Sequence, residues 1–164
     1  MNKTPLAFFL IFCLLGLSSS ASGNEPVGRF SFGFGYPYAS IKYGLSERYQ
    51  AELRCAFDSG ITVAGARAYR SFLREGRTSL FSGIEGSYIT FKTDEVRGDG
   101  FLVLAFAGGE YAVTKRFAFT FDIGPVYTWL RNAEYASISV SGIDWVLNTG
   151  FSYSFDLSRS SHEK

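Results

Sequence analysis

Two stretches late in the chain alternate between large apolar residues and small or polar ones. In 116–130 the odd positions hold Phe, Ile, Pro, Tyr and Trp, whereas the even positions hold mostly Ala, Thr, Gly, Val and charged residues. In 143–155 the odd positions are again mainly aromatic or aliphatic, and the even ones are Asp, Val, Asn, Gly and Ser. Successive side chains of a strand point to opposite faces, so this period of two predicts two β-strands. Each strand has one aromatic face and one small, polar face.

The two faces can be assigned by the room that a barrel offers. An eight-stranded barrel has a narrow interior, which rings at every second position would overcrowd. Small residues facing inward and rings facing lipid avoid this problem. Phe117 and Trp129 are 12 residues apart, which is about 40 Å along a strand and about 30 Å across a membrane at the usual tilt. We therefore predict a membrane barrel with an aromatic girdle at Phe117, Tyr127, Trp129 and Trp145. A soluble periplasmic barrel that binds a small apolar ligand is the alternative.

The same alternation, with more interruptions, continues through the earlier chain. The predicted strands lie near 27–36, 39–45, 49–57, 61–72, 79–92, 100–112, 116–130 and 142–156. At Tyr36-Pro37-Tyr38 the phase slips, which fits either a tight turn or a bulge in one long strand. The turn gives eight strands and the bulge gives seven. Single-chain bacterial barrels have even strand numbers, so we predict an all-β, eight-stranded antiparallel up-and-down β-barrel of the transmembrane type.

The N-terminus has the features of a secretory signal. Lys3 precedes an uninterrupted apolar run from Leu6 to Leu17, and small residues follow from Ser18 to Gly23. The run is shorter than the roughly 20 apolar residues that a membrane helix needs. We therefore expect a signal peptide at 1–23, an outer-membrane β-barrel at 24–156 and a polar C-terminal tail at 157–164.

Composition narrows the choice of partners. The chain has 17 Phe, 10 Tyr and 18 Gly, which favours strands joined by tight turns. Removing Lys3 with the leader lowers the 16 basic residues to 15, equal to the 15 acidic ones. A neutral chain gives no electrostatic reason to expect nucleic acid as a partner. Cys55 is the only cysteine after the leader, so the predicted mature chain has no internal disulfide.

The last predicted strand carries a recognisable signature. Asn148, Gly150, Tyr153 and Phe155 occupy the polar, glycine, aromatic and aromatic positions of the insertion signal that outer-membrane proteins carry near the C-terminus. With the leader and the alternation, the chain resembles the small eight-stranded outer-membrane barrels of the OmpA/OmpX type. The resemblance implies a location in the outer membrane of a Gram-negative bacterium, contact with outer-membrane lipid, and recognition by the barrel-assembly machinery during insertion.

Charged residues recur on the predicted inner face. They are Glu52, Arg54, Arg67 or Arg70, Glu85, Glu110, Asp122 and Asp144. Unpaired charges in a narrow lumen are unfavourable, so we expect these side chains to form mutual salt bridges that plug the lumen. A catalytic use of the same carboxylates is the weaker alternative.

The sequence argues against an enzyme. Two barrel enzymes of the outer membrane must be considered, the lipid A acyltransferase and the lipid A deacylase, and both families need a histidine that acts with a serine. His162 is the only histidine, and it lies in the polar tail beyond the last strand. We therefore expect no catalytic residues, no cofactor and no metal site.

One strand leaves the orientation of its side chains open. Leu102, Leu104 and Phe106 share a phase with Glu110, so they face either inward, where they would form an apolar pocket, or outward after a bulge near Gly108-Gly109. We favour the bulge. The expected function is that of a non-enzymatic integral outer-membrane protein with a structural or surface-interaction role, with a surface ligand of unknown kind at the loops 93–100 and 131–141.

Overall fold

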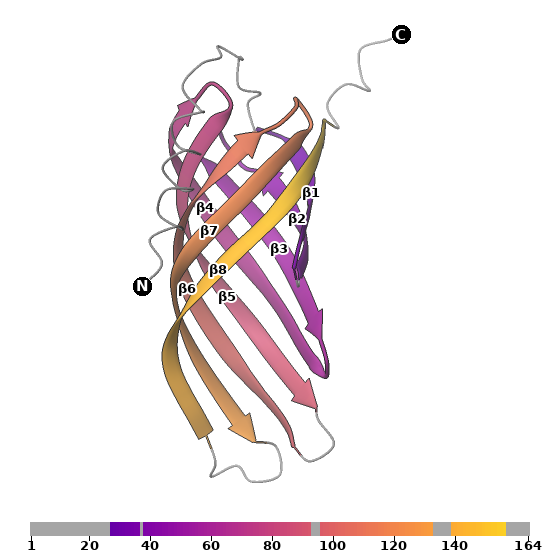
Figure 1. Ribbon diagram of the computed structural model, residues 1–164, viewed down its shortest axis with the longest axis vertical. Helices are drawn as coiled ribbons and strands as arrows, with labels where there is room; N and C mark the ends of the chain where they lie inside the picture. Colours follow the sequence, from indigo (N-terminus) through magenta and orange to yellow (C-terminus); the bar gives the residue numbers. More distant parts are fainter. Residues whose placement is uncertain (1–26, 37, 93–95, 133–138, 157–164) are drawn as a thin grey trace, which may run out of the picture.

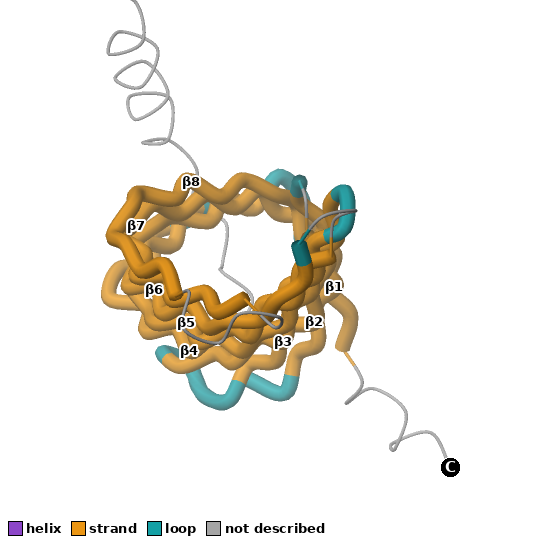
Figure 2. Tube along the Cα trace, turned by 90° about the horizontal axis from the view of Figure 1, so that it is seen from below, coloured by secondary structure: helices purple, strands orange, loops and turns teal. Residues whose placement is uncertain are grey.

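Eight antiparallel strands form a closed barrel, which confirms the predicted architecture and strand number (Figures 1 and 2). The computed structural model describes residues 27–36, 38–92, 96–132 and 139–156. The strands are β1 (Arg29–Gly35), β2 (Tyr38–Gly44), β3 (Tyr49–Asp58), β4 (Ile61–Glu75), β5 (Thr78–Lys92), β6 (Arg97–Ala112), β7 (Phe117–Asn132) and β8 (Ser139–Asp156). Each strand pairs with its neighbours in sequence, and β8 closes the ring by pairing with β1.

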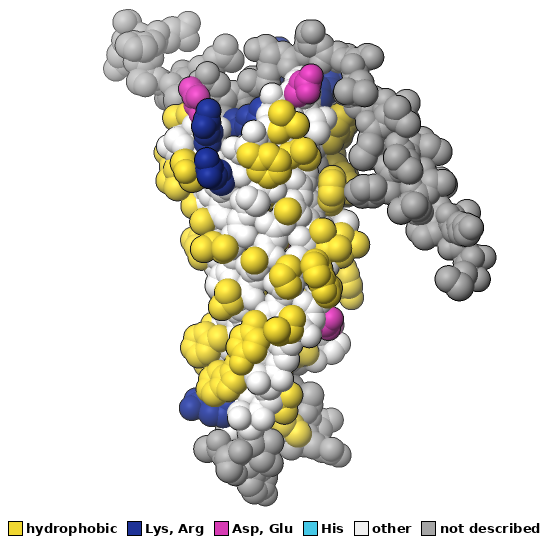
Figure 3. All heavy atoms as spheres, turned by 90° about the vertical axis from the view of Figure 1, so that its left-hand side faces the viewer, with side chains coloured by type: hydrophobic (Ala, Val, Ile, Leu, Met, Phe, Trp, Pro, Cys, Tyr) yellow, Lys and Arg dark blue, Asp and Glu magenta, His cyan; other side chains and the backbone are white. Residues whose placement is uncertain are grey.

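The outer wall is apolar and the lumen carries charge. Phe34, Ile84 and Trp145 are 60%, 64% and 67% exposed on the outside, whereas Arg67 and Asp122 are only 4% and 2% exposed. Figure 3 shows hydrophobic side chains along the whole height of one face of the barrel. The alternation seen in the sequence therefore separates an apolar outside from an inside that contains buried ionic groups.

The barrel has two ends, which we call the short-turn end and the long-loop end; the long-loop end also has two-residue connections, between β1 and β2 and between β3 and β4. At the short-turn end lie the turns between β2 and β3, β4 and β5, and β6 and β7, together with the start of β1 and the end of β8 (Figure 1). Gly76 adopts a φ of 56° in the turn between β4 and β5, a left-handed conformation that glycine tolerates best. The Oγ1 of Thr114 accepts hydrogen bonds from the backbone N–H groups of Arg116 and Phe117. These local bonds stabilise the turn between β6 and β7.

The opposite, long-loop end is uneven. The strands β1 and β2 have 7 residues each, whereas β5 has 15 and β8 has 18. Figure 1 shows β5 to β8 extending well past the β1–β2 hairpin at this end. Phe34 pairs with Ala39, so a tight turn joins β1 to β2, as predicted for the slip in phase near residue 37.

Strand ends at the long-loop side were predicted too short. The strand β6 begins at Arg97 and not near 100, β7 continues to Asn132, and β8 begins at Ser139. The predicted loops 93–100 and 131–141 are therefore partly strand. Their remaining residues, 93–95 and 133–138, lie outside the described residues, as do the predicted leader and tail. Within the described part of the chain, no helix has the length and apolarity to cross a membrane.

The strand β4 was also predicted too short, because it contains a β-bulge. Ser71 pairs with Phe81 and Leu73 pairs with Leu80, so Phe72 is an extra residue in β4. The predicted strand ended at 72, where the alternation breaks, yet pairing continues to Glu75. The extra residue reverses the phase of the residues after it: Ser71 faces the lumen, and Arg74, paired with Ser79, faces it as well.

Candidate functional site

Five side chains from five strands form a closed ring of hydrogen bonds across the lumen. We call this the lumen ring; its members are Arg54 on β3, Arg67 on β4, Glu85 on β5, Asp122 on β7 and Asn148 on β8. Arg67 donates through Nε to Glu85 and through Nη1 to Asp122 Oδ2 at 2.8 Å. Asn148 Nδ2 donates to Asp122 Oδ1 at 2.8 Å, Arg54 Nη2 donates to Asn148 Oδ1 at 3.4 Å, and Arg54 Nη1 donates to Glu85 Oε2 at 3.3 Å. The ring holds two positive and two negative charges and is neutral.

Burial makes this pairing important for the barrel. The side chains of Arg67 and Asp122 are 2% and 3% exposed, and those of Arg54 and Glu85 are 8% and 6% exposed. Removing a charge from water is unfavourable unless its partners restore the lost hydrogen bonds. Aromatic side chains also stabilise the two arginines. The Arg54 guanidinium lies over the Tyr38 side chain, 3.9 Å from its centroid, and the Arg67 guanidinium lies over the Phe106 side chain at 4.4 Å. Each arginine of the ring is therefore both ion-paired and stacked.

A second ion pair crosses the barrel nearer the short-turn end. Lys42 on β2 binds Glu110 on β6 at 3.0 Å, and Thr120 Oγ1 donates to the same carboxylate at 3.4 Å. In a ring of eight strands, β2 and β6 stand opposite each other, so this pair spans the lumen. Lys42 was missed in the sequence, although it shares the small, inward phase of Ser40 and could have been found from that signal.

An apolar cluster fills the lumen on the side of β4 to β7. It consists of Tyr69, Phe81, Leu104, Phe106 and Val126, with Leu102 and Val146 packed against it. The predicted bulge near Gly108-Gly109 is wrong, because β6 keeps one register with both neighbours from Gly98 to Tyr111. Leu104 and Phe106 consequently face inward and are 2% and 4% exposed. The cluster fills this part of the lumen with packed side chains, and the aromatic rings of Phe106 and Tyr69 lie edge to face with their centroids 5.2 Å apart.

Two other predicted lumen charges lie on opposite sides of the wall: Glu52 is buried inside and Arg70 is exposed outside. Glu52 is 5% exposed and lies between Lys42 and Arg67 on the neighbouring strands. Arg70 is exposed and belongs to the outward phase of β4, since Tyr69 and Ser71 on either side of it point inward. Two neighbours in a strand cannot face the same side, so the choice between Arg67 and Arg70 resolves to Arg67.

Asp144 also stands apart from the lumen ring. It is exposed, and its Oδ1 accepts a hydrogen bond from the backbone N–H of Trp145 at 2.7 Å. The pairing of β8 with β1 extends only to Gly150, so Asp144 lies in the part of β8 that rises above the β1–β2 hairpin. Strand length accounts for the exposure of Asp144, because the lumen is enclosed on all sides only where every strand is present.

The residues of the C-terminal signature have distinct places in the wall. Asn148 is a member of the lumen ring, a role that the sequence did not assign to it. A Cβ on Gly150 would clash with the Tyr38 hydroxyl and approach the Phe34 carbonyl oxygen to 2.8 Å, so glycine provides room at the seam of the barrel. Tyr153 is 43% exposed outside, and Phe155 stacks on Phe32 with centroids 5.2 Å apart.

The four predicted girdle aromatics all lie on the outer face. Phe117 stacks on Phe151 with centroids 5.3 Å apart, and Trp129 stacks on Phe101 at 6.5 Å. Tyr127 and Trp145 are 49% and 67% exposed. Phe117 begins β7 at the short-turn end and Trp129 lies near its other end, so the two stacked pairs are separated by most of the length of the barrel.

Neither metal ligands nor relatives point to another kind of site. Among residues 27–36, 38–92, 96–132 and 139–156, no group of three or more His, Cys, Asp or Glu side chains could hold a metal ion. Comparison with protein-family models and with curated protein sequences finds no match to this chain. The lumen ring, the Lys42–Glu110 pair and the apolar cluster are thus interpreted from their geometry alone.

Proposed function

We propose that this protein is a non-enzymatic, integral outer-membrane β-barrel of a Gram-negative bacterium, in the OmpA/OmpX style, with a lumen plugged by its charged side chains. Its role is structural or depends on surface interactions at the long-loop end. The barrel contacts outer-membrane lipid, and the barrel-assembly machinery recognises the signature from Asn148 to Phe155 during insertion. The observation that carries the proposal is the inverted distribution of polarity: large apolar side chains cover the outside, and ion pairs occupy the inside.

The outer wall supports this proposal because water solvates it poorly. Leu53, Ile84, Trp145 and Leu147 are each at least 64% exposed, and soluble monomers rarely expose large continuous apolar patches. A soluble barrel would have the same rings directed into its core. Hydrocarbon tails solvate such a wall, and a closed barrel leaves no backbone edge to desolvate where all strands are paired.

The contents of the lumen support a plug. Arg67 binds both Glu85 and Asp122, so the two carboxylates serve as ion-pair acceptors in the plug. In a planar bilayer we expect the purified protein to give no steady conductance, because the lumen ring and the apolar cluster occupy the cross-section. A stable open current would contradict the plug without contradicting membrane insertion.

Cell fractionation tests the location. The full chain, expressed with its leader in a Gram-negative host, should remain in the membrane pellet and require detergent for extraction. Folded protein should migrate differently from boiled protein on a gel, since closed barrels resist detergent unfolding. Recovery in the osmotic-shock fraction would instead support the soluble, ligand-binding barrel.

A substitution on the outer wall tests the environment directly. Ile84 is 64% exposed outside, at the level of Glu85 in the lumen ring. In lipid vesicles, Ile84→Arg should lower the free energy of unfolding by about 2–4 kcal/mol, because it places a charge among acyl chains. Thr90→Arg, on the same face but near the long-loop end of β5, should lower it by only about 0–1 kcal/mol.

Equilibrium urea unfolding of both variants in phosphatidylcholine vesicles measures this difference. If Ile84→Arg and Thr90→Arg are equally stable, the outer wall is not in contact with hydrocarbon and the membrane proposal fails. The two variants add the same side chain to the same strand, so their difference reports depth and not the properties of arginine.

A further inference from the structure

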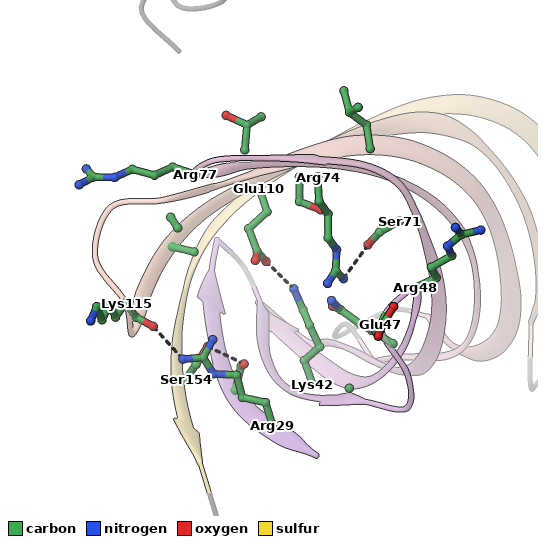
Figure 4. A pocket seen from close by; sticks show the side chains of 18 of the residues that line it. Arg29, Lys42, Glu47, Arg48, Ser71, Arg74, Arg77, Glu110, Lys115 and Ser154 are labelled. Atoms are coloured by element: carbon green, nitrogen blue, oxygen red, sulfur yellow. Dashed lines mark hydrogen bonds and ion pairs between the residues drawn. The ribbon is translucent and has the colours of Figure 1, made fainter. Parts of the chain in front are cut away.

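The short-turn mouth of the barrel is a cavity of about 760 Å³ with many basic residues in its wall. It lies between the three short turns and the paired ends of β1 and β8 (Figure 4). Among the described residues, the basic ones that line it are Arg29, Lys42, Arg48, Arg74, Arg77, Lys115 and Arg116, and the acidic ones are Glu47 and Glu110; Arg70 also touches the cavity, from the outward phase of β4. Apart from the outward-facing Arg70, seven of the 16 lysines and arginines of the chain therefore line one opening.

Among the residues that the structure describes, the basic ones at the mouth outnumber the acidic ones. Glu110 is bound to Lys42 at 3.0 Å, so this pair is neutral and forms the floor of the cavity. Figure 4 shows Arg48, Arg77 and Lys115 standing around the edge, with Glu47 beside Arg48. A concave site lined mainly by one sign of charge, with protein walls of low dielectric constant, concentrates the field and attracts counter-ions.

The β-bulge at Phe72 is a second, independent observation at the same place. Without the extra residue in the register, Arg74 would continue the alternation from Ser71 and point to the outside. With it, the Arg74 guanidinium points into the cavity, where Nη2 donates to Ser71 Oγ at 3.1 Å (Figure 4). Bulges often occur where a strand must redirect a functional side chain. The bulge at Phe72 therefore directs the Arg74 guanidinium into the mouth.

We propose that the short-turn mouth binds a phosphate-bearing anion, with Arg74 as its central donor and the turn arginines as its rim. Guanidinium groups bind phosphate oxygens through paired, charge-assisted hydrogen bonds. Figure 4 shows the Arg74 guanidinium inside the cavity, whereas Arg48 and Arg77 extend outward from its edge. The volume lies within the range of about 300–1,000 Å³ typical of small-ligand sites. The phosphate can belong to a soluble compound or to a lipid headgroup. The inference does not depend on the membrane proposal, because it concerns one end of the barrel in any solvent.

Calorimetric titration of the full chain with inorganic tripolyphosphate tests the site. The protein is held in an uncharged detergent at low salt. We expect saturable binding that weakens about tenfold in Arg74→Gln, the effect of losing one charge-assisted contact, and about threefold in Arg77→Gln at the rim.

The matched control is Arg131→Gln at the opposite end of the barrel. Arg131 binds Asp99 at 3.3 Å and its side chain is 49% exposed, so the substitution removes the same charge without touching the mouth. Binding should stay within about twofold of the wild type in this variant. Equal weakening by Arg74→Gln and Arg131→Gln would overturn the proposal, because the binding would then reflect net charge alone. A thermal melt of each variant checks that the barrel remains folded.

A second arm identifies the source of the phosphate. The protein is titrated with micelles of the same detergent that contain either phosphatidylglycerol or a neutral diacylglycerol. Arg74-dependent binding of tripolyphosphate alone assigns the mouth to soluble phosphates. Arg74-dependent binding of phosphatidylglycerol alone assigns it to a lipid headgroup, and binding of both supports the shared phosphate chemistry. Failure to bind either probe would overturn the proposal.

Discussion

Replacing Arg67 with methionine should lower the free energy of unfolding by about 3–5 kcal/mol. Arg67 is the only residue of the lumen ring that binds both of its carboxylates, Glu85 and Asp122. Methionine fills much of the same volume but leaves two buried negative charges facing a single remaining arginine, Arg54. The penalty comes from those uncompensated charges more than from the loss of packing.

Two further variants separate these causes. Arg70→Met removes an arginine three positions along β4 that faces outward, and should change stability by no more than about 0.5 kcal/mol. The double variant Arg67→Met/Asp122→Asn keeps the neutral Arg54–Glu85 pair and removes the unpaired charge, so it should recover part of the loss. Equilibrium denaturation in detergent micelles measures all three. An Arg67→Met protein as stable as Arg70→Met would show that the ring contributes nothing to the fold.

Replacing Phe106 with alanine should lower the free energy of unfolding by a similar amount, about 3–5 kcal/mol. The Phe106 ring packs edge-to-face against Tyr69 and Phe81, with centroids 5.2 and 6.3 Å away, and it lies under the Arg67 guanidinium. Alanine would leave a cavity in the closed lumen, where neither lipid nor a neighbouring side chain can fill the space. It would also remove one face of support from the lumen ring.

Phe101→Ala is the matched control on the same strand. Phe101 is 53% exposed on the outer wall and stacks on Trp129. In detergent micelles, detergent chains can fill the vacated space on this exposed face, so only a transfer contribution of about 1–2 kcal/mol is expected. The comparison uses the same substitution in both positions, measured by the same urea unfolding. Equal losses of unfolding free energy in the two variants would contradict the close packing of Phe106 in the lumen.

The sequence predicted the strands best where only one phase is apolar. In β7 and β8 the large and small residues separate cleanly, so both strands were located with only their long-loop ends misplaced. In β6 both phases are apolar, with Phe101, Val103 and Ala105 on one side and Leu104 and Phe106 on the other. A single strand then contains no information about which side faces inward. Its neighbours decide, because Leu104 pairs with Glu85 and Val126, whose phases point into the lumen.

The composition of the lumen ring was predictable only in part. Alternation assigns Arg54, Glu85 and Asp122 to the inward phase of their strands, and all three side chains lie in the lumen ring. A sequence does not state the height of each residue in a tilted barrel. Asp144 has the inward phase and still lies apart, because β1 and β2 end below it. Arg74 is the opposite case, because it has the outward phase in the sequence and yet faces the lumen. A bulge reverses the phase within a strand, and a phenylalanine at position 72 gives no sequence signal for a bulge.

The short β1–β2 hairpin has a consequence for any bilayer around this barrel. Strands of 7 residues are about 23 Å long and rise only about 18 Å when tilted by about 40°. A transmembrane strand usually needs about 9–11 residues. A bilayer would have to be thinner beside this hairpin, whereas beside β5 to β8 the strands are long enough for a bilayer of ordinary thickness. The barrel would then sit in a lipid annulus of unequal thickness, with its thinnest sector against β1 and β2.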